Sequence, residues 1–262
     1  MTTYTVSIDS EGPDAALHRM VLAGLPNSYR LVERDADVVL ISAPDPAKLH
    51  GRFSSNTRAV VVDQPGLLSP GGLAAIGHTT DGHECIVVPA LRYAPRLAAA
   101  GDLLGDCRVD ILESTVTSTR SLRSSLVEQL ALLRTTLGEV ASIQALTVAE
   151  SHYVFAATML DHPQANVLLN GVKSLTATDE ATLHSLSADR RVVVRIDARP
   201  VGRPAEISLY DASGTRTPWP VHQHAHRLTL TQLHGVLTTG QGNMPYSFEL
   251  LRQDLQLIDP FL

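Results

Sequence analysis

Residues 59–65, Ala-Val-Val-Val-Asp-Gln-Pro, decide the fold, because a short apolar run ends here in an acid, an amide and a proline. The consecutive valines predict a strand that is buried on both faces, as strands of parallel sheets are. Pro65 ends the strand, since proline cannot donate to a sheet ladder. Asp63 and Gln64 are therefore expected at the carboxyl end of a parallel strand, where open α/β sheets bind their ligands.

Other apolar runs in the first hundred residues have the same character. Residues 4–8, 35–42 and 85–89 each predict a short strand, and helical segments at 15–24 and 69–76 alternate with them. Strands that alternate with helices are typical of a parallel, doubly wound sheet. The N-terminal part of the chain is therefore predicted to be an open α/β sheet, with the polar pair after the valines at its binding edge.

The pattern changes near residue 105. Residues 108–117 alternate between apolar and polar side chains, and an amphipathic helix at 121–137 follows, with Gly138 as its stop. Further strands are expected at 142–149, 153–159, 166–169, 192–196 and 206–210. Two terminal helices are expected at 228–239 and 246–257. Alternation with one polar face indicates an open, mostly antiparallel sheet that helices cover on one side.

Composition excludes several classes of function. A net charge of −6 and a pI near 6.0 argue against an electrostatic grip on nucleic acid or an anionic membrane, which needs clustered basic residues. Lys48 and Lys173 are the only lysines, so most reactions that need a catalytic lysine are excluded. Cys85 and Cys107 form neither a disulfide framework nor a zinc knuckle. Since no leader peptide and no run of membrane-spanning length is visible, we expect a cytoplasmic protein.

Four local patterns occur in the order of a known family. They are Ala-Asp-Val-Val-Leu-Ile-Ser-Ala-Pro at 36–44, Asp-Gln-Pro at 63–65, Leu-Arg-Tyr-Ala-Pro at 91–95 and Asp-Ala-Ser-Gly at 211–214. The chain resembles a degenerate, shortened member of the Gfo/Idh/MocA family of nicotinamide-dependent sugar and small-molecule oxidoreductases. The resemblance implies a dinucleotide-binding domain, then an α/β domain whose open sheet carries dimer contacts.

The fold class that follows is α/β. A truncated Rossmann-like parallel-sheet domain is expected at 1–105, joined to an α/β domain with a large, mostly antiparallel open sheet at 106–262. Truncation is expected because residues 25–34 are all that remain for the second strand and helix of such a domain. The expected partners are a small-molecule substrate and a second copy of the chain, bound through the C-terminal sheet, with no nucleic acid and no membrane.

The expected cofactor site departs from the family pattern. The family has Gly-x-Gly-x-x-Gly in the first turn, and its three glycine positions fall on Ser10, Gly12 and Ala15. Those glycines let the backbone approach a pyrophosphate at a helix N-terminus, and Pro13 also removes a donor there. Ser10 and Gly12 are thus a vestigial cofactor site, and the acid or arginine for the adenosine ribose has no obvious position. We expect no cofactor, with NAD(P) as the alternative.

The family's catalytic positions are changed as well. Its Glu-Lys-Pro motif is Asp63-Gln64-Pro65 here, and the aspartate and histidine of its second-domain helix correspond to Ser124 and Glu128. Because burial raises the pKa of a carboxyl group toward neutrality, Asp63 and Glu128 are the candidate acid and base. The candidate substrate-binding residues are Gln64, Arg92, Tyr93, Ser124 and His152.

Three functions remain open at this stage. The leading hypothesis is a biosynthetic small-molecule enzyme that does cofactor-independent acid–base chemistry, such as isomerisation, elimination or cyclisation. The alternatives are an NAD(P)-dependent oxidoreductase with a relaxed cofactor site, and a non-catalytic partner or ligand-binding protein. Two interpretations of Asp63 and Gln64 stay open. They are either polar residues that remain from a site that has lost its function, or residues of a site remodelled for another reaction.

A histidine-rich run at 222–226, His-Gln-His-Ala-His, is a candidate metal site. In an extended chain His222, His224 and His226 would share one face and could bind zinc or nickel. The run leads into a predicted helix, however, where the three imidazoles would no longer converge. We therefore expect a polar linker and no bound metal.

Overall fold

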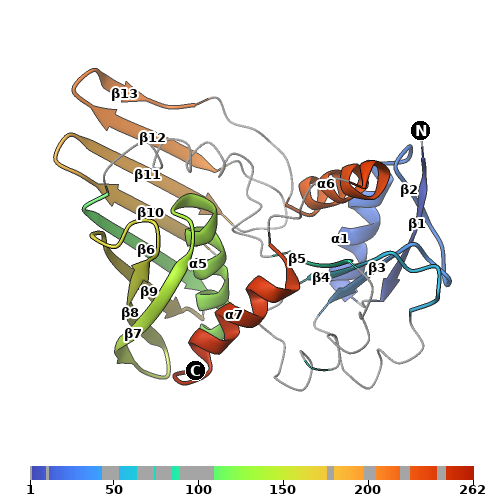
Figure 1. Ribbon diagram of the computed structural model, residues 1–262, viewed down its shortest axis with the longest axis horizontal. Helices are drawn as coiled ribbons and strands as arrows, with labels where there is room; N and C mark the ends of the chain where they lie inside the picture. Colours follow the sequence, from blue (N-terminus) through green and yellow to red (C-terminus); the bar gives the residue numbers. More distant parts are fainter. Residues whose placement is uncertain are drawn as a thin grey trace. The chain divides into compact units, whose positions relative to one another are not determined.

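The computed structural model describes residues 2–9, 12–42, 53–63, 74, 84–88, 109–175, 180–197, 205–218, 225–240 and 246–262. It consists of two compact units (Figure 1). Unit 1 comprises Met1–Pro89 and His226–Gln253, and unit 2 comprises Ala90–Ala225 and Asp254–Leu262. The division therefore falls before residue 105, and it assigns residues 226–253, expected in the second domain, to the first unit.

Unit 1 is built on a parallel sheet in which the strand order is β2-β1-β3-β4-β5. Its strands are β1 (Tyr4–Asp9), β2 (Tyr29–Leu31), β3 (Val38–Ser42), β4 (Ala59–Asp63) and β5 (Glu84–Val88). Helix α1 (Gly12–Ala23) connects β1 to β2, and helix α6 (Ala225–Thr239) comes from the C-terminal part of the chain. The chain adds β2 on one side of β1 and β3 on the other, which is the switch point at which such sheets bind ligands.

Strand β4 confirms the prediction made from the valine run. All five of its residues are buried, and it pairs in parallel with β3 on one side and β5 on the other. A strand enclosed in this way has apolar neighbours on both faces, which explains the uninterrupted β-branched sequence. Asp63 is its last residue and lies at the carboxyl edge of the sheet, as expected.

Strand β2 corrects the expectation that the second strand was lost. Tyr29–Leu31 pairs in parallel with β1, and the Val32 amide extends the ladder by donating to the Val6 carbonyl oxygen over 2.8 Å. Three residues suffice here because β2 is an edge strand, which needs a partner on one side only. The unit keeps a complete β1–α1–β2 element.

Helix α6 is part of unit 1 through contacts far apart in sequence. The Tyr29 hydroxyl donates to the Leu230 carbonyl oxygen over 2.7 Å, and the rings of Tyr4 and Tyr29 meet His234 edge-on. Burial, with Tyr4 nearby, raises the pKa of Tyr29 far above its ordinary value, so the phenol keeps the proton that it donates. These contacts explain why α6 belongs to unit 1 rather than to the second unit.

Unit 2 is an eight-stranded sheet in the order β13-β12-β11-β10-β6-β9-β8-β7, parallel at β6–β9 and antiparallel elsewhere. Its strands are β6 (Ile111–Ser118), β7 (Val140–Val148), β8 (His152–Met159), β9 (Asn166–Lys173), β10 (Glu180–Leu186), β11 (Arg190–Asp197), β12 (Glu206–Asp211) and β13 (Gly214–Arg216). Helix α5 (Leu122–Thr136) packs on one face (Figure 1). Helix α7 (Phe248–Ile258) begins in unit 1 and ends in unit 2. The mostly antiparallel open sheet is confirmed.

Helix α5 is fixed by polar contacts at its start and in its middle. Ser121 caps the N-terminus by accepting a hydrogen bond from the Ser124 amide over 3.1 Å. Gln129 is fully buried, and its Nε2 donates to the Ser114 and Asn170 carbonyl oxygens, each at 3.0 Å. Its Oε1 accepts from the Tyr153 hydroxyl over 2.7 Å. One amide therefore ties the helix to β6, β8 and β9.

No helix in the part of the chain that the structure describes is both long enough and apolar enough to cross a membrane.

Candidate functional site

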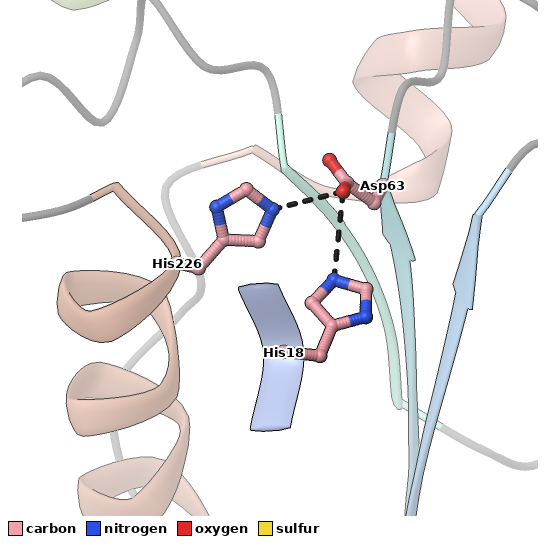
Figure 2. A group of neighbouring side chains, drawn as sticks. All are labelled: His18, Asp63 and His226. Carbon is pink, nitrogen blue, oxygen red and sulfur yellow. Dashed lines mark ion pairs between the residues drawn. The ribbon is translucent and has the colours of Figure 1, made fainter. Parts of the chain in front are cut away.

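Asp63 is the centre of a buried polar cluster at the carboxyl end of β4 (Figure 2). Its Oδ2 lies 2.9 Å from Nε2 of His226 and 3.5 Å from Nε2 of His18. The exposed fractions are 5% for Asp63, 2% for His18 and 8% for His226. All three residues belong to unit 1, so the cluster is complete within one compact body.

The two histidines lie in the buried stripes of their helices. On α1, His18 lies between Ala15 and Val21, which are both buried and one turn away in either direction. On α6, His226 begins the buried row that continues through Leu230 and Leu233. The rings of His18 and His226 meet at a centroid distance of 5.3 Å. Packing of both helices therefore brings the two imidazoles to the same carboxylate.

The electrostatics of the cluster correct the expected behaviour of Asp63. Burial alone would raise the pKa of this carboxyl group, but His226 and His18 outweigh burial and hold the pKa well below its ordinary range. Asp63 is therefore ionised at neutral pH. The prediction that burial brings its pKa toward neutrality is wrong, because the sequence did not reveal the two histidines beside it.

The donor atoms have the arrangement of a metal-ligating group. One nitrogen of each histidine and one carboxylate oxygen of Asp63 lie within 4.8 Å of one another. Of the predicted metal candidates, His226 takes part, whereas His222 and His224 lie outside the described residues. Sequence reasoning missed His18 as a site residue. Its position in an apolar helical stripe, opposite a strand that ends in an acid, was the available signal.

The predicted residues of unit 2 lie on two elements. Glu128 and Ser124 are both buried on α5, one turn apart, and Ser124 contributes its amide and hydroxyl to the cap at Ser121. His152 is the first residue of β8 and is exposed. It lies on the sheet face opposite Tyr153, the side chain that points toward α5. The structure thus groups Glu128 with Ser124 and separates His152 from them.

Of the remaining predicted residues, Gly12 is the one that lies within the described part of the chain. Gln64, Arg92, Tyr93 and Ser10 lie outside the described residues. Gly12 is the first residue of α1 and follows β1 after a two-residue connection. The helix therefore begins at the carboxyl edge of the sheet, the position in which helix N-termini bind phosphate groups in dinucleotide folds.

Two charged residues follow β2 at the same edge. Glu33 and Arg34 are exposed and come about 20 residues after Gly12, the spacing at which dinucleotide folds carry the residue that contacts the adenosine ribose. Charged residues are therefore present at this position, and contact of either one with a ribose stays a prediction. Spacing from Gly12 is the sequence signal for Glu33, but no strand was predicted before it.

Comparison with known proteins identifies the fold. Neither a protein-family model nor a curated protein matches the sequence. Among solved structures, a putative NADPH-dependent oxidoreductase from Desulfitobacterium hafniense has a TM-score of 0.77 at 11% identity, covering 98% of this chain and 94% of its own. UDP-N-acetylglucosamine 3-dehydrogenase from Acidithiobacillus ferrooxidans has a TM-score of 0.73 at 12% identity, covering 98% and 95%.

A third structure bears on the cofactor. The WlbA dehydrogenase from Chromobacterium violaceum, solved with NADH and UDP-GlcNAcA, has a TM-score of 0.69 at 14% identity, covering 98% of this chain and 92% of its own. Since proteins with this fold bind NADH, the expectation of a cofactor-free chain is corrected. The chain shares, over almost its whole length, the fold of oxidoreductases of the Gfo/Idh/MocA type.

Proposed function

We propose that the chain is an NAD(P)-dependent oxidoreductase that acts on a hydroxyl or carbonyl group of a small polar molecule. The observation that carries the proposal is the β1–α1–β2 element at the switch point of a parallel sheet. The proposal is supported by the solved structures that share the fold, which include an oxidoreductase and dehydrogenases. This proposal replaces the cofactor-independent reaction that the sequence favoured.

The residues of unit 1 fit a dinucleotide in two respects. The N-terminus of α1 directs backbone amides toward the carboxyl edge of the sheet, and Gly12 there has no side chain to block a phosphate. Glu33, after β2, is suited to accept hydrogen bonds from ribose hydroxyls. When bound, the nicotinamide supplies or accepts the hydride. We assign Gly12 and Glu33 to holding the cofactor.

The resemblance implies that the lysine of the Glu-Lys-Pro motif donates to the substrate, and this chain has Gln64 at that position. Gln64 cannot deliver a proton, and Asp63 is held ionised by His226 and His18, so neither serves as a general acid at neutral pH. We propose Glu128 for this role, because it is a buried carboxylate on α5 and corresponds to the family's histidine. Gln64, Arg92, Tyr93, Ser124 and His152 remain predictions for substrate contacts.

The substrate class is proposed from the structures that share the fold. They include UDP-N-acetylglucosamine 3-dehydrogenase, the WlbA dehydrogenase in complex with UDP-GlcNAcA, and levoglucosan dehydrogenase in complex with L-sorbose. We therefore propose a sugar or nucleotide-sugar hydroxyl as the reacting group.

Dimerisation through the open face of the unit 2 sheet also remains a prediction, to be tested by light scattering on the purified chain.

The cofactor proposal predicts a preference for NADH over NADPH. The Glu33 carboxylate accepts from the ribose 2′-hydroxyl and repels a 2′-phosphate, so replacing it by serine removes both effects. In Glu33→Ser we expect the ratio of the NADPH to the NADH dissociation constant to fall about tenfold, or about 1.4 kcal/mol. Quenching of protein fluorescence by each nucleotide measures both constants.

Glu150→Ser is the matched control for this experiment, because Glu150 is an exposed glutamate of unit 2. It should leave the ratio as in the unsubstituted chain. An unchanged ratio in Glu33→Ser would contradict the assignment of Glu33 to the adenosine ribose.

A further inference from the structure

We propose that unit 1 binds a divalent transition-metal ion through Nε2 of His18, Nε2 of His226 and the carboxylate of Asp63. The sequence patterns suggested a metal only for His226, in a group with His222 and His224, and did not point to His18 or Asp63 as ligands. The proposal does not depend on nicotinamide binding, because the three ligands come from the packing of α1, β4 and α6 alone. It is a second, independent property of the unit.

The distances between the donor atoms suit a shared ion. Zinc binds imidazole nitrogen at about 2.0–2.1 Å and carboxylate oxygen at about 2.0–2.2 Å, so ligands at tetrahedral angles lie about 3.3 Å apart. The two nitrogen–oxygen distances here, 2.9 and 3.5 Å, lie on either side of that value. All three donor atoms lie within 4.8 Å of one another, so one ion can be within reach of each of them.

The chemistry of the donors indicates the class of metal. Imidazole suits zinc, iron, copper and nickel, and two histidines with one carboxylate form the ligand set of several zinc and non-haem iron sites. Calcium and magnesium favour sites made of oxygen ligands alone. Three protein ligands also leave a coordination position open to water or another ligand. The expected occupant is thus Zn²⁺ or a similar first-row ion.

Burial also favours a bound cation. Both Nε2 atoms lie near the same oxygen, Oδ2 of Asp63, in a region where all three residues are more than nine-tenths buried (Figure 2). A buried carboxylate needs ionic or hydrogen-bonding partners. A divalent ion placed between Oδ2 of Asp63 and the two Nε2 atoms would interact with all three ligands at once. Each ligand is held by a helix or strand rather than a loop, which preorganises the site.

The test is metal uptake by the full chain. The protein is stripped with a chelator, dialysed against Zn²⁺ and freed of excess ion, and the bound metal is counted by elemental analysis. We expect about one Zn²⁺ per chain. In a separate scan with free Zn²⁺ at about 100 times its Kd, we expect a rise in Tm of about 5 °C or more, as linkage predicts. A Zn²⁺ content below about 0.2 per chain, with an unchanged Tm, would overturn the proposal.

Variants identify the ligands. His18→Gln, Asp63→Asn and His226→Gln should each lose the retained Zn²⁺, whereas His234→Gln, on the same helix as His226, should keep it. Zinc retention in all three ligand variants would place the ion elsewhere and overturn the assignment. If a ligand variant does not fold, the visible absorption spectrum of the unsubstituted chain loaded with Co²⁺ is the deciding measurement. Visible bands of a four- or five-coordinate site with nitrogen and oxygen ligands support the proposal, and an octahedral aqua-type spectrum overturns it.

Discussion

Replacement of Asp254 by alanine is expected to destabilise unit 2 by about 3–5 kcal/mol, because it leaves a buried arginine without its carboxylate. Asp254 is completely buried on α7, and its Oδ1 accepts from Nε and Nη2 of Arg134 over 2.9 and 2.7 Å. The Arg134 side chain is only 6% exposed. Removal of the acid therefore leaves a guanidinium that water cannot fully solvate. Urea unfolding, followed by circular dichroism, measures the loss.

The chain supplies a matched control for this pair. Arg123 on α5 also pairs with an aspartate near the C-terminus, Asp259, at 2.7 Å, but that aspartate is exposed. Asp259→Ala should therefore cost less than about 1 kcal/mol. Replacing both buried partners, Arg134→Met with Asp254→Leu, should recover part of the stability. If both variants lose the same free energy of unfolding, burial does not make the Arg134–Asp254 pair more important for stability than the exposed pair.

Replacement of Gly171 by alanine is expected to cost about 3 kcal/mol, because the added methyl group has no room. A Cβ at this position on β9 would overlap the ring of Tyr153 on the neighbouring strand β8. That ring cannot move aside, since it is 1% exposed, packs against Phe155 and donates its hydroxyl to Gln129. The expected result is a lower urea midpoint with a weakened link between α5 and the sheet.

Two further variants test the cause of this loss. Gly235 lies on α6 with open space around it, so Gly235→Ala should stabilise the chain by about 0.5–1 kcal/mol. A gain there would show that adding a methyl group to a glycine is not destabilising in itself. In a Tyr153→Ala background, Gly171→Ala should cost much less than in the original chain. If its cost is the same in both backgrounds, the overlap with Tyr153 is not the reason.

The sequence predicted most strands of the fold and missed β2, β10 and β13, of which the first two have a physical explanation. β4 was found because enclosure on both faces requires an uninterrupted apolar run. β10 was missed because its inward row contains Ala181 and Ser185 around a single leucine, so the apolar alternation is faint. β2 was missed because its ladder is only three residues long.

The site was predictable only in part. Asp63 followed from the strand and proline that surround it. The pairing of residues 18, 63 and 226 depends on helix packing across the unit, which no local spacing can reveal. His226 was grouped with His222 and His224 on the assumption of an extended chain, but α6 already begins at Ala225.

The cofactor expectation failed for a related reason. It counted glycines in the first turn, whereas much of the phosphate site in such folds comes from backbone amides at a helix N-terminus. The β1–α1–β2 element keeps that terminus although Ser10 and Ala15 replace two glycines. Loss of the motif therefore does not by itself remove the geometry on which nucleotide binding depends.

Calorimetric titration of the unsubstituted chain with NADH tests the central claim most directly. We predict saturable binding of about one NADH per chain with a Kd of about 1–100 μM, in the range where cofactors and substrates of such enzymes bind. No heat of binding from either NADH or NADPH, up to about 1 mM, would contradict the oxidoreductase proposal.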